Sequence, residues 1–245
     1  MINKNLIKKI IKESLGIIYY YAYKKYMANV GNRCLIYHAF GSKLKHDTYG
    51  ISITMGKFRE HIKYLSDNYM FKKVHEKVGE NLCISISIDD GYICTIDAID
   101  FLNKYNIPVT LFVTIETLNK IQYLTTKDLI DISKLPNVTI GCHGYTHKKL
   151  SNMTYNEQYI ELKKSKEELS ELIGKEVDGL SFPHGLFNND TLNILSKLKY
   201  IYAATSIKGT NTLDTSMYKL CRNEVISTDS LNDLQKKING YYEYY

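Results

Sequence analysis

The feature that most constrains the fold is a series of short apolar runs that alternate with helical patterns along most of the chain. Seven runs have the length and composition of β-strands: 34–37, 83–88, 109–113, 138–142, 179–182, 201–205 and 219–226. One helical pattern, Thr95 to Asn106, stops before Pro108, because proline disrupts a helix interior. Strands that alternate with helices favour a parallel sheet that closes, or nearly closes, into a barrel.

Length and composition fit one catalytic domain, residues 31–245, preceded by a basic amphipathic helix in residues 1–30. The 245 residues are 44% hydrophobic, which is enough for one large core. Two more helices are predicted, one from a capping box at Thr154 to Gly174 and one from Asn189 to Leu198.

Two adjacent carboxylates, Asp89 and Asp90, end the strand predicted at 83–88, and Gly91 follows as a turn. Adjacent acids repel each other, so a metal ion or a nearby cation is expected to compensate them. Taken alone, an ordinary acidic turn explains them equally well.

Two histidines, His143 and His147, follow the strand predicted at 138–142. Their spacing of four predicts both imidazoles on one face of a helical turn, which suits two nitrogen ligands on one ion. Alone, His147 beside two lysines is better explained as a solvated residue. A third segment, Ser181 to Gly185, holds one of only three prolines and predicts a shaped loop.

The order Asp-Asp, His-x-x-x-His, Phe-Pro-x-Gly resembles the polysaccharide deacetylases with a NodB-homology domain, metal-dependent carbohydrate esterases of family 4 that remove N-acetyl groups from sugars. The resemblance covers roughly residues 33 to 226. It implies an irregular (β/α) barrel of about seven parallel strands. It also implies hydrolysis of the N-acetyl group of an amino sugar in a polysaccharide, oligosaccharide or lipid-linked glycan, with a role in glycan biosynthesis.

The resemblance also assigns roles to residues. Asp90, His143 and His147 become ligands of a divalent metal, and Asp89 becomes the catalytic base. Zinc is the default metal, although nickel or cobalt would suit the same ligands. The remaining assignments concern the proline loop, which lines the substrate groove through Phe182, Pro183 and Gly185 and helps to hold the oxyanion through the backbone N–H of His184.

The chain departs from the common family pattern in its late catalytic histidine. No histidine follows His184, and the chain has no tryptophan. The segment from Cys34 to His38 resembles the early Tyr-His segment of the poly-N-acetylglucosamine deacetylases, which makes His38 the candidate general acid. A core histidine with a structural partner is the alternative.

The family arginine that precedes the proline loop is also absent. Arg222, the only arginine in the second half of the chain, is the hypothetical replacement that reaches Asp89, orients it and keeps it ionised. A surface ion pair explains Arg222 equally well. Two other functions stay open: an inactive saccharide-binding module on the same fold, and a metal-dependent amidase for a small non-sugar amide.

The positive charge of the chain is concentrated at its N-terminus. Residues 1–27 hold six lysines and one glutamate, a net charge of +5, whereas the whole chain carries +6. The nearly neutral remainder argues against nucleic acid as a partner. Isoleucines at helical spacing, followed by tyrosines, predict an amphipathic helix in peripheral contact with an anionic membrane. A helix packed on the barrel with a solvated lysine face is the alternative.

The uncharged run from Ser14 to Tyr23 makes a poor signal peptide, because it has only ten residues, is rich in tyrosine and lacks a small-residue cleavage site. It is also too short to span a bilayer. The five cysteines are odd in number and show no Cys-x-x-Cys spacing, which suits a reducing compartment. The sequence therefore predicts a cytoplasmic enzyme, located peripherally at the inner membrane face.

Overall fold

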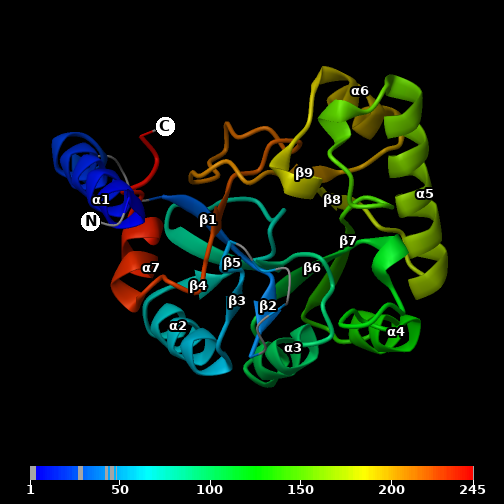
Figure 1. Cartoon of the computed structure of the whole chain (residues 1–245), viewed down its shortest axis with the longest axis horizontal. Coiled ribbons are helices and arrows are strands. Elements are labelled where there is room, and N and C mark those ends of the chain that lie inside the picture. Colours follow the sequence, from blue (N-terminus) through cyan, green and yellow to red (C-terminus); the bar gives the residue numbers. More distant parts are fainter. Residues whose placement is uncertain (1–3, 27–29, 42–43, 45–46, 48, 245) are drawn as a thin grey trace.

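The protein is built around a sheet of parallel strands that curls into a nearly closed barrel (Figure 1). The structure, a computed structural model, describes residues 4–26, 30–41, 44, 47 and 49–244. The seven main strands lie in the spatial order β10 (Arg222–Glu224), β1 (Gly31–Tyr37), β5 (Leu82–Ile88), β6 (Val109–Val113), β7 (Val138–Cys142), β8 (Gly179–Ser181) and β9 (Tyr202–Ala204). All seven predicted strands are confirmed.

The two edges of this sheet, β9 and β10, meet at a short seam. Ala204 of β9 forms a parallel bridge with Leu220, two residues before β10 begins. The backbone N–H of Thr205 also donates a hydrogen bond of 2.8 Å to the carbonyl of Leu220. The barrel is therefore closed by a few contacts rather than by a full ladder.

Three short strands were not predicted. β4 (Met70–Phe71) pairs with the first part of β5, while β2 (Ala39–Phe40) and β3 (Ser52–Ile53) form a separate two-stranded sheet. Each has two residues, too few to show the alternation by which a strand is predicted.

Helices cover the outside of the barrel (Figure 1): α2 (Met55–Asn68), α3 (Thr95–Lys104), α4 (Thr126–Ser133), α5 (Tyr155–Ile173), α6 (Asn189–Lys197) and α7 (Leu231–Ile238). The capping box of Thr154 and Glu157 is present at the start of α5, and Gly174 ends this helix in the left-handed conformation at φ 66°. These are the boundaries that the sequence predicts. α3 begins as predicted and ends two residues earlier, at Lys104.

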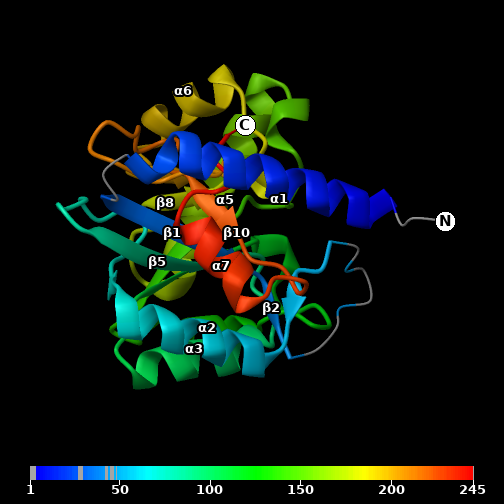
Figure 2. The same ribbon diagram turned by 90° about the vertical axis from the view of Figure 1, so that its left-hand side faces the viewer.

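The N-terminal helix α1 (Lys4–Ala22) lies outside the barrel, beside α7 and the C-terminal end of the chain (Figures 1 and 2). Within the described part of the chain, α1 and the other helices are too short or too polar to cross a membrane. The core is formed by the apolar side chains of β1, β5 and β6 and the inner faces of the helices.

Candidate functional site

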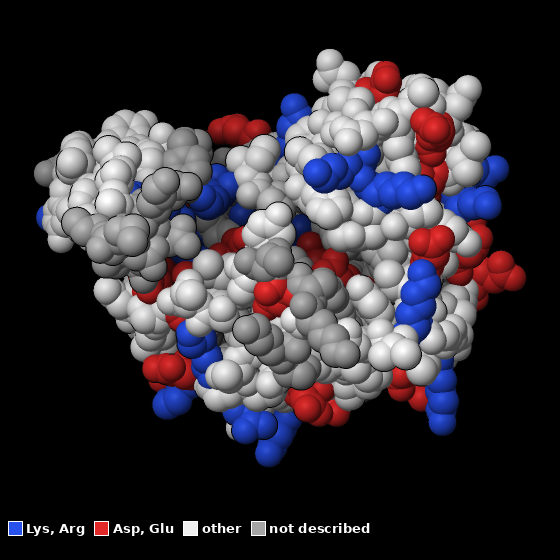
Figure 3. All heavy atoms as spheres, in the orientation of Figure 1, with Lys and Arg blue, Asp and Glu red and all other residues white. Residues whose placement is uncertain are grey.

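The predicted site residues meet at one end of the barrel. They follow the carboxyl ends of β1, β5, β7 and β8, which all point the same way in a parallel barrel and so form one rim. They line a cavity of about 490 Å³ that includes His38, Asp89, Asp90, His143, His147, Phe182, His184 and Gly185. Figure 3 shows acidic side chains in a hollow near the middle of this face. Pro183 is buried in the short helix Pro183–Gly185 and does not line the cavity.

Three candidate ligand atoms converge at this rim. Nε2 of His143 lies 3.3 Å and Nε2 of His147 lies 3.2 Å from Oδ1 of Asp90. The two Nε2 atoms are 3.2 Å apart. An ion with bonds of about 2.0–2.2 Å keeps its ligand atoms roughly 3.0–3.4 Å from one another. The three side chains therefore fit one divalent ion.

The ring of His143 is oriented for this role by its other nitrogen. Nδ1 donates a hydrogen bond of 2.9 Å to the carbonyl oxygen of Ser181, so Nε2 is the nitrogen left to face Asp90. Burial alone would lower the pKa of His143, but the carboxylates of Asp89 and Asp90 raise it above its ordinary value. The raised pKa is that of a buried ring held close to negative charge.

The predicted helical turn around the two histidines is wrong. Residues 143–149 form a loop after β7, in which Gly144 and His147 both have positive φ angles, 72° and 63°. Glu161 of α5 takes the place of helical hydrogen bonds, since its Oε1 accepts from the backbone N–H groups of Tyr145 at 2.9 Å and Thr146 at 2.7 Å. The loop brings both imidazoles to one point without a helix.

Glu161 is therefore a functional residue that sequence reasoning missed. The signal was its place on the buried face of α5, with Gln158, Leu162, Ser165 and Leu169. A buried carboxylate needs partners that are hydrogen-bond donors. The sequence could therefore have indicated that Glu161 bonds to a neighbouring loop, but not which loop.

We expect Glu161→Ala to weaken Zn²⁺ binding about tenfold to a hundredfold, because the loop that holds His147 loses its anchor and groups that orient metal ligands have effects of this size. A titration against a competing chelator measures the affinity. Glu167→Ala on the same helix is the control, because the side chain of Glu167 is 65% exposed. An unchanged affinity in folded Glu161→Ala would contradict this role.

Asp89, the carboxylate that is not among the three candidate ligands, has a different partner. Nη1 and Nη2 of Arg222 donate to the two oxygens of Asp89 at 2.7 and 2.8 Å, and Ser181 Oγ donates to Oδ2 at 2.9 Å. Arg222 is fully buried and Asp89 is 3% exposed. Arg222 thus reaches Asp89 as hypothesised, and the alternative of a surface ion pair is excluded.

This network fixes the charge of Asp89. Burial alone would raise the pKa of this carboxyl, but the guanidinium of Arg222 and the ring of His143 more than offset burial, so the pKa lies below its ordinary value. Ser87 and Ser181, which also bond to Arg222 at 3.1 and 2.5 Å, were missed. Their signal was a serine on an otherwise apolar strand, which needs a polar partner inside the barrel.

His38 lies between β1 and β2, half-buried at the wall of the cavity. The pairing of Tyr37 with Ile88 aligns β1 and β5, so His38 and Asp89 leave their strands side by side. Within the described part of the chain, the buried Nδ1 of His38 has no hydrogen-bond partner. The alternative of a core histidine satisfied by a structural partner does not fit this ring.

The proline loop forms another wall of the cavity. Residues His184 and Gly185 both adopt positive φ, 59° and 68°, which turns the chain sharply after Phe182. The ring of His184 lies 4.7 Å from that of His147. Burial and the neighbouring His147 lower the pKa of His184, which favours its neutral form.

Aromatic residues complete the cavity and were not singled out from the sequence. The rings of Tyr92 and Tyr123 stack at 4.8 Å, and Tyr49 lines the cavity with 82% of its surface exposed. With 22 tyrosines scattered along the chain, no local pattern distinguishes these three. Tyrosine faces of this kind can pack against the apolar faces of sugar rings.

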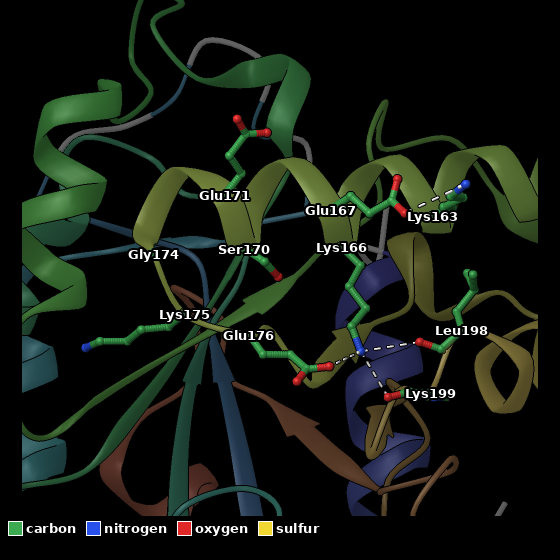
Figure 4. Close-up of a pocket in the computed structure, with 10 residues that line it drawn as sticks. All are labelled: Lys163, Lys166, Glu167, Ser170, Glu171, Gly174, Lys175, Glu176, Leu198 and Lys199. Carbon is green, nitrogen blue, oxygen red and sulfur yellow. Dashed lines mark hydrogen bonds and ion pairs between the residues drawn. The ribbon is translucent and has the colours of Figure 1, made fainter.

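A second hollow, of about 570 Å³, lies at the end of α5 (Figure 4). Its charged side chains are engaged with one another and with backbone carbonyls: Lys166 contacts Glu176 at 3.3 Å and the carbonyl of Lys199 at 2.9 Å, and Lys163 contacts Glu167 at 3.7 Å. No histidine or cysteine lines it. The cavity at the barrel rim is therefore the candidate active site.

Comparisons with known proteins agree with this geometry. The Bacillus subtilis (strain 168) protein YxkH, named as a polysaccharide deacetylase, is 27% identical over 200 residues, which cover 77% of this chain and 69% of that protein. The poly-beta-1,6-N-acetyl-D-glucosamine N-deacetylase of Staphylococcus aureus (strain MRSA252) is 23% identical over 239 residues, which cover 88% of this chain and 80% of that protein.

A solved structure, the Streptococcus pyogenes deacetylase PplD in complex with acetate, has the same fold, with a TM-score of 0.75 at 20% identity. The structural match covers 85% of this chain and 98% of the PplD chain. The family profile described as polysaccharide deacetylase matches residues 76–203, just over half of the chain. On this match, the chain belongs to the polysaccharide deacetylase family.

Proposed function

We propose that this protein is a metal-dependent hydrolase that removes N-acetyl groups from an N-acetylated amino sugar in a polysaccharide, oligosaccharide or lipid-linked glycan. The observation that carries the proposal is the convergence of Asp90, His143 and His147 within 3.2–3.3 Å of one another, beside an Asp89 that Arg222 keeps charged. Family membership supports the reaction class.

Asp90, His143 and His147 would hold the metal. A divalent ion in such a site polarises a carbonyl and lowers the pKa of water. One carboxylate and two imidazoles leave coordination positions open for the reaction. These ligands suit zinc, and they also suit nickel or cobalt.

Asp89 is the base in this proposal. Its carboxylate is ionised, and Oδ2 lies 4.0 Å from Nε2 of His143, next to the metal ligands but paired with Arg222. Asp89 takes a proton from the attacking water. Arg222 acts as a positioning residue, since it holds both carboxylate oxygens and keeps them from turning away.

His38 is the general acid. Cleavage of an amide needs a proton on the departing nitrogen, since an unprotonated amine anion is a very poor leaving group. The position of His38 beside Asp89 at the cavity wall supports this role, and its Nδ1 is not committed to another described residue. The backbone N–H of His184 helps to hold the oxyanion, as the family pattern implies.

The substrate class follows from the cavity and the relatives. Tyr49 and Tyr123 line the cavity and offer aromatic surface to a sugar ring, which a small non-sugar amide would not need, and the buried Tyr92 supports Tyr123 by stacking on it. The Staphylococcus aureus relative is named for poly-beta-1,6-N-acetyl-D-glucosamine. The intact Asp89–Arg222 pair supports an enzyme rather than an inactive binding module, because a binding module has no use for a buried base.

The proposal is tested by metal content measured together with acetate release. We expect one divalent ion per chain, and metal-dependent acetate and free amine from N-acetylglucosamine oligomers or lipid-linked glycan precursors. Stoichiometric metal without acetate release from these saccharides would overturn the enzymatic claim. Release only from small non-sugar amides would replace the substrate class.

His38→Gln is expected to lower acetate release from N-acetylated saccharides about a hundredfold, the lower end of the range for general acid catalysis, with metal content unchanged. The control is chemical: hydrolysis of 4-nitrophenyl acetate, whose leaving group needs no proton, should be nearly preserved. Equal losses on both substrates would show that His38 serves the metal site or the fold instead of the leaving group.

A further inference from the structure

Helix α1 exposes its apolar face to solvent. Its large apolar and aromatic side chains are between 41% and 64% exposed: Ile7, Ile10, Ile11, Leu15, Ile17, Ile18 and Tyr21. They recur at intervals of three and four residues, so they form one stripe along the helix. In Figure 3, most of the described surface over α1 is white.

The opposite face of α1 is the one that contacts the protein. Gly16 is buried there, where an added Cβ would lie 2.8 Å from the carbonyl oxygen of Tyr241. Tyr20 stacks on Tyr241, with ring centroids 4.0 Å apart and planes 13° apart. Lys12 Nζ lies 4.8 Å from the ring centre of Tyr242. The helix is thus anchored through its polar and aromatic residues.

This orientation is the reverse of the usual one, in which a surface helix buries its apolar stripe and exposes its charges. The sequence left open a helix packed on the barrel with a solvated lysine face; α1 packs on the C-terminal segment, and its apolar stripe lies outside. Contiguous apolar patches of this kind mark a binding surface.

We propose that α1 lies on an anionic lipid surface and docks the protein there. Charge favours lipid over a second copy of the chain, because residues 1–27 carry a net charge of +5 and two such helices would repel each other. Tyr21 and Tyr23 are 55% and 56% exposed at the C-terminal end of α1, and tyrosine is favoured at the level of the headgroups. The 19 residues of α1 span about 28 Å, enough for a helix in the membrane plane.

Helix α1 runs roughly along the direction of the barrel strands (Figure 2). The N-terminal end of α1 points to the same side as β2, which follows the carboxyl end of β1 (Figure 2). The rim that holds the cavity therefore lies on the side to which α1 extends.

The test measures sedimentation of the full chain with vesicles of phosphatidylcholine, with and without phosphatidylglycerol. We expect binding to vesicles that contain phosphatidylglycerol, weakened by salt, and a loss of roughly tenfold or more in the partition coefficient of Ile11→Glu/Ile18→Glu. Ile160→Glu on α5 is the matched control, since Ile160 is 55% exposed on a helix of the opposite side, and it should bind like the unchanged protein.

Two results would overturn the proposal. One is vesicle binding that Ile11→Glu/Ile18→Glu leaves unchanged. The other is that the unchanged protein binds neither kind of vesicle and is a dimer by light scattering, whereas the double variant is a monomer. That result would assign the apolar stripe to contact with a second copy of the chain. Acetate release from a soluble oligosaccharide should be the same in the double variant, so the outcome is independent of the proposed activity.

Discussion

Asparagine in place of Asp89 is expected to lower the rate of acetate release roughly a thousandfold while the metal stays bound. The amide has nearly the shape of the carboxylate but cannot take a proton from water, and a general base contributes between about a hundredfold and ten-thousandfold. Because Oδ2 of Asp89 lies 4.0 Å from Nε2 of His143, and Asp90 supplies the ligand oxygen, Asp89→Asn leaves the candidate ligands intact.

The measurement pairs metal content with acetate release at saturating substrate, so that a loss in kcat is separated from a loss in metal. Asp131→Asn is the control, because the side chain of Asp131 is 58% exposed and does not line the cavity. Loss of metal from folded Asp89→Asn would instead make Asp89 a ligand. Activity close to that of the unchanged protein would remove Asp89 from the reaction.

Arg222→Met is expected to destabilise the protein by about 3–5 kcal/mol at neutral pH, since it removes one partner of a buried ion pair and leaves the other without a counter-charge. The side chain of Asp89 would still have Ser181 as a donor. Without the guanidinium, the pKa of Asp89 rises, and the acid side of the pH–rate profile moves to higher pH.

The destabilisation caused by Arg222→Met is expected to depend on pH in a definite direction. In the unchanged protein the pKa of Asp89 lies below its ordinary value of 3.8. The pairing of Asp89 with Arg222 therefore stabilises the fold at pH values above 3.8, and this contribution is lost as the pH falls through the pKa of Asp89 in the folded state. The stability gap between Arg222→Met and the unchanged protein should therefore shrink on acidification. Urea unfolding at several pH values measures the gap, and exposed Arg59→Met is the control. A gap below about 1 kcal/mol at neutral pH would contradict the argument.

The order of the strands and the rim of the barrel could be predicted because apolar periodicity is local and strong. Asp89 and Arg222 could be paired although they are 133 positions apart, since a buried acid needs a cation and the second half of the chain offers only one arginine. The loop of His147 could not be predicted, because its shape depends on Glu161 in a later helix. Local spacing carries no information on such a distant partner.

The orientation of α1 shows another limit. Its sequence predicts two faces but not which of them meets the protein. The partner of α1 is the C-terminal segment, which contacts it through Tyr241 and Tyr242, more than 200 residues away in the sequence. Amphipathicity therefore predicted the helix correctly and left its docking open.

The seam between β9 and β10 gives Arg222 a second duty. Its Nε donates a hydrogen bond of 2.9 Å to the carbonyl of Thr205, just after β9, while its Nη atoms hold Asp89 after β5. One side chain thus joins the edge of the barrel after β9 to Asp89, the proposed base. A molecule whose seam has opened has lost the bond from Arg222 to Thr205, so the side chain that holds Asp89 is less firmly fixed before the barrel unfolds further.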